Sequence, residues 1–321
     1  MGKTIKIWLI AGTVLILAGI LLFGGVMTVL KWDFSKLSTV KYQTVTHKVD
    51  EPYTNISVIT DTADIVFVPS PDGATTITCH EQANVTHSVG VQDGTLVISV
   101  VDTRKWHEYI GINFGKASIT VSLPQGDYGA LTLASDTGDT SIPAGFCFES
   151  ISVSESTGDV ALRASASGAI RINTSTGDIL VKDISAGSLN LSVSTGRVTV
   201  SQVTCQEDAT IRVSTGKVQL TDLICGNFTS SGDTGTITLE NVLVSGKITI
   251  ERDTGDVKFD RCDAAELFIQ TDTGSVSGTL LTSKVFLVST DTGSISVPKT
   301  TTGGKCEITT DTGNIKISVA S

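Results

Sequence analysis

The side chains that most often carry catalysis or bind metals lie near the N-terminal side of this 321-residue chain. All four histidines, His47, His80, His87 and His107, precede a long run of repeats that contains none. A nucleophile–histidine–carboxylate arrangement would therefore have to lie before the repeats, where no nucleophile elbow frames a serine. We assign no catalytic residue and expect a protein that is not an enzyme.

Cys79, His80, Glu81 and His87 are ligand types that zinc accepts, and they lie close together in the chain. Neighbouring residues of a strand point to opposite faces, and neither CxxC nor HExxH spacing is present. We interpret them as ordinary strand residues, with a zinc site as the alternative. We assign no metal ligand and no cofactor.

A column of acidic residues is the second candidate site. Five aspartates precede Thr-Gly pairs at even spacing, with Asp256 nearby: Asp233, Asp253, Asp272, Asp291 and Asp311. Carboxylates ~4.8 Å apart on stacked strands repel each other, and calcium bound between them would relieve that repulsion. The alternative is that they are hydrated and accept hydrogen bonds from backbone N–H groups of their own turns. The spacing is not that of the glycine-rich calcium nonapeptide, so we assign no calcium ligand.

Three of the six cysteines stand at equivalent positions, nine residues after a repeat glycine. Cys147, Cys205 and Cys225 occupy a position where other repeats carry small residues such as Ala186. A small inward position favours free buried thiols. Cys205 and Cys225 alone would lie close enough on adjacent turns for a disulfide.

These residues must be positioned by a repeat of 19 or 20 residues. A Thr-Gly pair, always preceded by Asp or Ser, recurs ten times, with its glycine at Gly138, Gly158, Gly177, Gly196, Gly216, Gly235, Gly255, Gly274, Gly293 and Gly313. Apolar residues alternate on both sides of the pair, which is the period of β-strands. The pattern predicts an all-β fold, a single-chain β-solenoid of about ten rungs over residues 129–321. A sandwich or a propeller is the alternative, although turn spacing varies more in the first and repeats are longer in the second.

Both ends of the predicted stack need covering, because a sheet edge exposes unpaired backbone groups. Residues 42–128 lack the Thr-Gly pair but still alternate as strands do, and we expect them to form a β-rich cap on the first rung. The chain stops at Ser321, directly after the last strand. We therefore expect this C-terminal rung to be an uncovered edge.

Residues 1–41 differ from the rest. No charged residue occurs from Ile7 to Leu30, a length sufficient for a helix to cross a ~30 Å hydrocarbon core. We predict a transmembrane helix at about 7–30, between a short N-terminal tail and a juxtamembrane linker. A signal peptide is the alternative, but its apolar stretch is shorter and ends in a small-residue cleavage site. Ala11, Ala18 and Gly25 lie seven residues apart and would let two such helices pair.

The charge of the chain is uneven. It has 23 basic and 33 acidic residues, and five of the lysines and one aspartate lie within 1–41, so the net charge of −10 becomes −14 for residues 42–321. This acidity argues against nucleic acid as a partner. Lysines flank the apolar segment on both sides, and a six-residue leader usually stays inside. We expect a single-pass protein of the cell membrane with an extracytoplasmic solenoid.

Three features resemble a known bacterial family. They are the Trp-Asp-Phe-Ser-Lys-Leu stretch at 32–37, Leu123-Pro124, and the run of Ser/Asp-Thr-Gly-Asp turns behind an apolar segment. The chain is similar over nearly its whole length to a putative adhesin family of unknown function with a membrane anchor and Thr-Gly-Asp β-strand repeats. The resemblance implies a β-solenoid, attachment to the cell envelope and no assigned catalytic residues. The chain departs from the fuller turn where the second Asp is replaced, at Arg197, Lys217, Thr236, Ser275, Ser294 and Asn314.

These observations predict a non-enzymatic, membrane-anchored cell-envelope protein that presents a β-solenoid for adhesion or binding. Expected partners are the lipid bilayer and a surface or envelope protein or glycan, with self-association through the C-terminal rung or the transmembrane helix. The alternative is an accessory or sensor in envelope signalling that acts through a membrane partner. A glycan-active β-helix enzyme is less favoured, because the aromatic residues of the repeats mostly fall at inward positions: Phe228, Phe259, Phe268 and Phe286.

Overall fold

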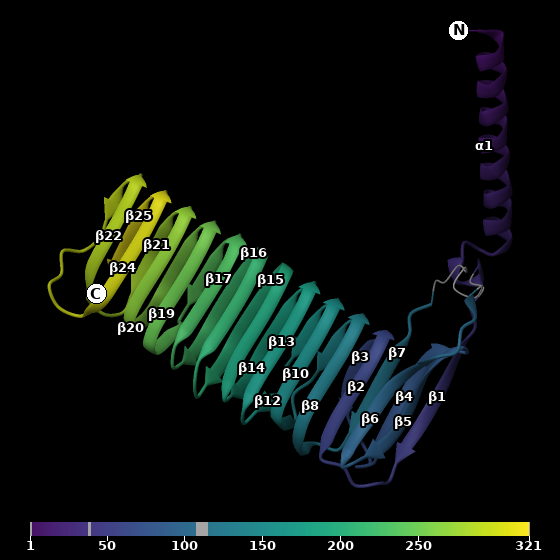
Figure 1. Cartoon of the computed structure of the whole chain (residues 1–321), viewed down its shortest axis with the longest axis horizontal. Helices are drawn as coiled ribbons and strands as arrows, with labels where there is room; N and C mark the ends of the chain where they lie inside the picture. Colours follow the sequence, from purple (N-terminus) through teal and green to yellow (C-terminus); the bar gives the residue numbers. More distant parts are fainter. Residues whose placement is uncertain (1, 38–39, 107–114, 321) are drawn as a thin grey trace.

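A computed structural model describes residues 2–37, 40–106 and 115–320 and shows an N-terminal helix followed by a long β-solenoid (Figure 1). Helix α1 (Lys3–Val29) leads into a short 3-10 helix, η1 (Phe34–Leu37). The span Ile5–Val29 is long and apolar enough to cross a membrane, with a mean hydropathy of 2.5 and none of its most apolar stretch buried. The helix therefore stands apart from the solenoid and contributes nothing to its core.

The described residues form 25 β-strands that belong to one continuous hydrogen-bonded system. In chain order they are β1 (Tyr42–Val49), β2 (Asn55–Thr62), β3 (Asp64–Pro69), β4 (Thr75–Gln82), β5 (Val85–Gln92), β6 (Thr95–Asp102), β7 (Ser118–Leu123), β8 (Gly126–Thr137), β9 (Thr140–Ile142), β10 (Phe146–Thr157), β11 (Val160–Leu162), β12 (Ser165–Ala166), β13 (Ala169–Thr176), β14 (Ile179–Ala186), β15 (Ser188–Cys205), β16 (Ala209–Cys225), β17 (Phe228–Thr234), β18 (Ile237–Glu240), β19 (Leu243–Thr254), β20 (Val257–Thr273), β21 (Val276–Leu280), β22 (Lys284–Thr292), β23 (Ile295–Ser296), β24 (Gly304–Thr312) and β25 (Ile315–Val319).

Two long sheets enclose the core. The first runs β5-β6-β2-β8-β10-β13-β15-β16-β17-β19-β20-β24-β22. The second runs β1-β4-β7-β3-β9-β11-β14-β15-β16-β18-β20-β21-β25-β23, the long strands passing from one sheet into the other. Successive rungs are in register, so Ile151, Ile170 and Leu189 stack in one buried column. Such columns bury a continuous apolar core, which confirms the predicted solenoid of about ten turns.

The Thr-Gly pair forms the corner between the two sheets. Gly216 has a φ of +148°, and a Cβ there would lie 1.7 Å from the carbonyl oxygen of Gly196 on the neighbouring rung. Only glycine allows the rungs to stack at this distance. A second corner six residues later uses polar residues with φ of 49° to 58°, which the Thr-Gly pattern does not indicate: Asp183, Gln202, Asp222, Asn241 and Arg261.

The N-terminal end of the stack is assembled out of chain order. Strands β2 and β3 lie next to β8 and β9, and Ala63 takes the corner position that Gly138 takes in the next rung. Strands β6 and β7 add a further parallel rung beyond them. Strands β5, β4 and β1 then pair antiparallel and complete the end. Residues 42–128 thus contribute two rungs of the stack as well as the strands that cover it.

At the C-terminal end, the last two rungs are exchanged relative to chain order. Strands β24 and β25 lie between β20–β21 on one side and β22–β23 on the other (Figure 1). The expectation that the rung preceding Ser321 forms the uncovered edge is therefore wrong, and β22 and β23 form it instead. The physical reason is that all rungs carry nearly the same inward pattern. The rung of β24 and β25 can therefore pair with β20 and β21 in the place that chain order would give to β22 and β23.

Candidate functional sites

Aspartates that follow the repeat glycines connect successive rungs. The backbone N–H of Asp139 donates to Asp64 Oδ1 at 2.9 Å, and the same bond recurs from Asp159 and Asp178 to the preceding aspartate at 3.0 and 2.7 Å. The ladder ends at Arg197, whose N–H donates to Asp178 Oδ1 at 2.7 Å. The second Asp of the turn is therefore a structural residue that ties neighbouring rungs together.

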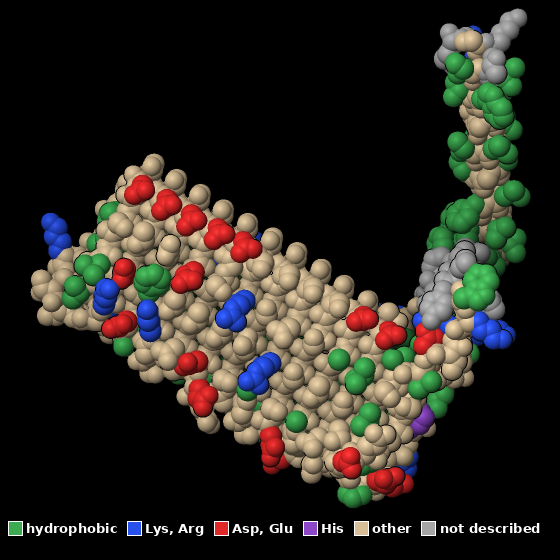
Figure 2. Space-filling view, viewed as in Figure 1, with side chains coloured by type: hydrophobic (Ala, Val, Ile, Leu, Met, Phe, Trp, Pro, Cys, Tyr) green, Lys and Arg blue, Asp and Glu red, His purple; other side chains and the backbone are tan. Residues whose placement is uncertain are grey.

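Aspartates that precede the Thr-Gly pairs are arranged differently. All five of the predicted column are exposed, and within the described residues none of their carboxylates makes a hydrogen bond or an ion pair: Asp233, Asp253, Asp272, Asp291 and Asp311. The expected hydrogen bonds to their own turns are thus not formed. Figure 2 shows a row of acidic side chains along this edge of the solenoid. The edge offers a cation one hydrated carboxylate per rung, which is far from the six or more oxygen ligands of a calcium site.

Glu155 is a carboxyl group inside the solenoid, only 5% exposed. Neither of its oxygens has a hydrogen-bond partner among the described residues, and neither does the Thr140 hydroxyl. Burial, together with the negative charges of Asp139, Asp159 and Asp64, raises the pKa of Glu155 to about 7. Glu155 can therefore bind a proton near neutral pH, but its burial keeps it away from substrates.

An open groove with a volume of about 890 Å³ runs along the C-terminal rungs. Its floor includes the nearly buried column Cys205, Cys225 and Val244, and its rim includes Ile224 and Leu243, which are 49% and 39% exposed. We call it the axial groove, defined by residues 205–206, 224–226, 243–245, 263–265, 282–284 and 303–304. All six cysteines of the chain are free thiols, and burial raises the pKa of Cys205 to about 11 and that of Cys225 to about 12. These thiols stay protonated at neutral pH and act as small core residues.

The axial groove is mostly apolar. Its two charged side chains, Asp263 and Lys284, form an ion pair at 2.7 Å between Oδ1 and Nζ. None of the residues that line it is aromatic. Phe228 and Phe259 are buried, as the sequence predicts, whereas Phe268 lies on the outer face with Lys247 Nζ 5.0 Å from its ring centroid. The groove therefore has no aromatic platform on which a sugar ring could stack.

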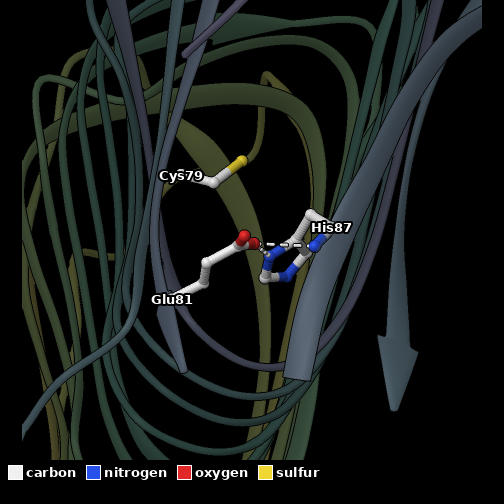
Figure 3. A group of neighbouring side chains, drawn as sticks. All are labelled: Cys79, Glu81 and His87. Carbon is white, nitrogen blue, oxygen red and sulfur yellow. Dashed lines mark hydrogen bonds and ion pairs between the residues drawn. The ribbon is translucent and has the colours of Figure 1, made fainter. Parts of the chain in front are cut away.

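A cluster of three metal-ligand types lies inside the N-terminal end of the solenoid (Figure 3). Cys79 and Glu81 are two residues apart on β4 and both point inward, and His87 faces them from β5 in the opposite sheet. Their ligand atoms all lie within 4.8 Å of one another, and all three side chains are buried. His80 points to the other face, where its ring stacks on Tyr42 at 5.1 Å between centroids. We call Cys79, Glu81 and His87 the inner cluster.

Hydrogen bonds orient the inner cluster. The backbone N–H of His87 donates to Glu81 Oε2 at 2.7 Å, and His87 Nδ1 lies 2.9 Å from the same oxygen. The other ring nitrogen, Nε2, lies 3.0 Å from Thr60 Oγ1, and Gln43 Nε2 donates to Glu81 Oε1 at 3.4 Å. Burial, helped by the charge of Glu81, raises the pKa of the Cys79 thiol to about 12. Without a bound cation this thiol is protonated.

The sequence singled out the residue types of the inner cluster but not their convergence. Alternation along β4 correctly separates His80 from Cys79 and Glu81. It does not indicate that β5 lies in the opposite sheet, because β4 and β5 pair only at Gln82 and Val85 and then diverge. Among the other histidines, His47 lies on β1, and His107 lies outside the described residues.

Comparison with solved structures returns other bacterial proteins. They include a putative adhesin from Bacteroides fragilis, 17% identical over 87% of this chain and 97% of that chain, with a TM-score of 0.37. A putative lipid binding protein from Parabacteroides distasonis is 16% identical over 74% of this chain and 94% of that chain, with a TM-score of 0.47. A putative adhesin from Parabacteroides merdae is 12% identical over 87% of this chain and 96% of that chain, with a TM-score of 0.48. No curated protein sequence matches.

A family match covers most of the chain. Residues 53–225 and 206–321 each match the Toastrack DUF4097 family. The two matches together cover residues 53–321, which include strands β2 to β25 and every Thr-Gly corner of the stack, and leave out β1 and the N-terminal helix. The resemblance seen in the Ser/Asp-Thr-Gly-Asp turns is thereby confirmed, and the chain belongs to the Toastrack DUF4097 family.

Proposed function

We propose that this protein is a non-enzymatic component of the bacterial cell envelope, anchored in the membrane by α1, that presents its solenoid outside the cytoplasm for adhesion or binding. Helix α1 is the observation that carries the proposal. Nearly all side chains of its 25-residue apolar span are exposed, Met27 near its C-terminal end being buried, and among the described residues none of the span belongs to the solenoid core. An apolar helix of this length is stable with all its faces exposed only in lipid.

Cell fractionation tests the anchor. The full chain is expected in the membrane fraction, and a variant lacking residues 1–31 in the soluble fraction. A full chain that fractionates as a soluble protein, or a processed chain that has lost α1, would overturn the proposed anchor and favour a cleaved signal sequence.

A membrane-impermeant maleimide tests the orientation. Because the native thiols of the solenoid are largely buried, a single exposed cysteine can be read against the wild-type background. Lys258→Cys on the outer face should react in intact cells, whereas Gly2→Cys, on the other side of α1, should react only after lysis. The reverse pattern would place the solenoid in the cytoplasm.

We expect the partner to contact the axial groove and to be a protein. Ile224 and Leu243 expose apolar side chains at the rim, in the column where the preceding rungs carry Ser185 and Thr204. An exposed apolar strip that replaces polar residues of the same column is typical of a protein contact. A glycan would need aromatic platforms, which the lining lacks.

Cell adhesion to surfaces coated with envelope preparations tests this surface. Ile224→Asp with Leu243→Asp should reduce adhesion at least tenfold, and the matched control, Ser185→Asp with Thr204→Asp, should not. Trypsin treatment of the coating should abolish adhesion and periodate treatment should preserve it. Sensitivity to periodate alone would make the partner a glycan, and equal loss in both double variants would exclude the groove.

A role in envelope signalling through a membrane partner is the second candidate. The small residues of α1 favour it, because nothing lies within 4 Å of a Cβ placed at Gly12, Gly19 or Gly25, so a second helix could approach. Replacing Ala18 and Gly19 by Leu should then abolish the signalling output while the protein stays in the membrane. An unchanged output would exclude pairing through this face.

A further inference from the structure

We propose that the inner cluster is a zinc site, with Cys79 Sγ, Glu81 Oε2 and His87 Nδ1 as its three protein ligands. Thiolate, carboxylate and imidazole are the three side-chain ligand types that zinc accepts, and their mixture suits this borderline-soft ion better than calcium or magnesium. The Glu81 carboxylate and the His87 ring face each other from two opposite sheets, and the Cys79 sulfur lies within 4.8 Å of both on the inner side of β4 (Figure 3). The site is independent of the proposed adhesive function.

The atoms that would not bind the ion are already held by neighbours. Thr60 Oγ1 lies 3.0 Å from His87 Nε2 and can accept a hydrogen bond from Nε2–H, and in that tautomer Nδ1 carries no proton and can act as a ligand. Gln43 Nε2 holds Glu81 Oε1, so Oε2 is the oxygen turned toward His87. Outer hydrogen bonds of this kind fix the tautomer and the orientation of zinc ligands.

The distances require only small adjustments. Zinc–ligand bonds of about 2.0–2.3 Å in a tetrahedron place ligand atoms roughly 3.3–3.7 Å apart. His87 Nδ1 and Glu81 Oε2 are now 2.9 Å apart, and the Cys79 sulfur lies within 4.8 Å of both. A slight separation of the first pair and a rotation of the Cys79 side chain are sufficient, since the ion replaces the proton between nitrogen and oxygen.

The charges balance when zinc binds. A Zn²⁺ ion with one thiolate, one carboxylate and one neutral imidazole has no net charge, which favours burial. The Cys79 thiol must lose its proton to solvent when the ion binds, as every thiolate ligand does. The bound ion would join β4 and β5 across the core beside β2, and so fasten the covered end of the solenoid.

Cobalt spectroscopy on the full chain in detergent tests the proposal. The reduced protein is incubated with excess Co²⁺, freed of unbound ion and examined by absorption and metal analysis. We expect about one retained Co²⁺ per chain, a thiolate-to-cobalt charge-transfer band in the near ultraviolet and tetrahedral bands in the visible, all displaced by Zn²⁺. A wild-type protein that retains no cobalt overturns the proposal, whatever the variants do.

Variants then identify the ligands. Cys79→Ser should remove the charge-transfer band, and Thr60→Val should weaken metal affinity about tenfold or more while keeping the band. His80→Gln, on the other face of the same strand, and Cys306→Ser, a buried thiol at the far end, are matched controls that should retain both band and affinity. A band that persists in Cys79→Ser, or disappears in Cys306→Ser, assigns the metal to another site. Circular dichroism identifies any variant that fails to fold, and in that case Thr60→Val decides.

Discussion

At the residue scale, position relative to the repeat glycine determines what a carboxylate does. Asp159, directly after a glycine, accepts a backbone hydrogen bond from the next rung, whereas Asp253, two residues before one, is exposed to water. Glu155, three residues before a glycine, points inward. A carboxylate thus stabilises the stack, charges its surface or carries a buried titratable proton, depending on where it lies within the four positions around the glycine.

Glu155→Gln should remove a pH dependence of stability. Burial, with the nearby negative charges, raises the folded-state pKa from 4.5 to about 7, so the folded protein binds a proton that the unfolded chain releases. The stability from this proton is fully present below pH 4.5 and is lost as pH rises through 7, by about 3 kcal/mol at about 1.4 kcal/mol per pKa unit. Urea unfolding should show a decline from pH 5 to pH 8 in wild type, a flatter profile in Glu155→Gln, and a more stable variant at pH 8.

Glu149→Gln is the matched control for this measurement, because Glu149 is an exposed carboxyl on the same strand, β10. It should leave the slope of the wild-type profile unchanged. A Glu155→Gln variant with the wild-type slope would show that another group carries the pH dependence.

Gly216→Ala should destabilise the stack severely. The added Cβ would lie 1.7 Å from the Gly196 carbonyl oxygen in a backbone conformation with φ of +148°, so the rungs would have to separate locally. We expect a loss of at least about 3 kcal/mol in the free energy of unfolding. Gly90→Ala on β5, where nothing lies within 4 Å of the new Cβ, should change stability by less than about 1 kcal/mol. Comparable urea midpoints for the two variants would contradict close packing at the corner.

At the element scale, local pattern predicts the strands and not their order. Period-two alternation around each Thr-Gly pair predicts both sheets and the inward columns, because one buried face per strand is a local requirement. Stacking order depends on which equivalent rungs meet, and any rung with the same inward pattern fits against any other. The exchange of β22–β23 with β24–β25 is therefore invisible in the sequence, and so is the inner cluster, which exists only because β4 and β5 lie in opposite sheets.

Engineered disulfides can test the exchanged order. Phe268 and Glu307 are register partners on adjacent rungs, with a spacing of ~4.8 Å that falls in the range a disulfide bridges. The Phe268→Cys/Glu307→Cys double variant should therefore crosslink under mild oxidation, as a mobility shift on non-reducing gels. Phe268→Cys/Leu287→Cys places the thiols two rungs apart, about 9.6 Å, and should not crosslink. Crosslinking of the second pair in place of the first would restore simple chain order.

At the scale of the whole molecule, the solenoid has two unlike ends and a strong net charge. The N-terminal end is completed by antiparallel strands, whereas at the C-terminal end one side of β22 and β23 pairs with no other strand of the described residues. The uncovered edge exposes Leu287 (52%) and Ile295 (47%), and no charge occurs from Val285 to Thr290. Because a copy cannot stack onto the covered end, two solenoids that stack end to end can do so only through the uncovered edge of each.

Self-association of the full chain in detergent should therefore depend on salt and on this edge. The charge of −14 on residues 42–321 repels a second copy, and salt shortens the range of that repulsion from ~10 Å at 0.1 M to ~3 Å at 1 M, so sedimentation should show more dimer at high salt. Leu287→Lys puts a charge on the uncovered strand and should shift the protein to monomer at every salt concentration. Leu281 is also exposed (40%) but lies outside β22, so the control variant Leu281→Lys should retain the dimer. A dimer that persists in Leu287→Lys would have to form through α1 instead. A wild-type chain that is monomeric at every salt concentration would contradict self-association through the uncovered edge.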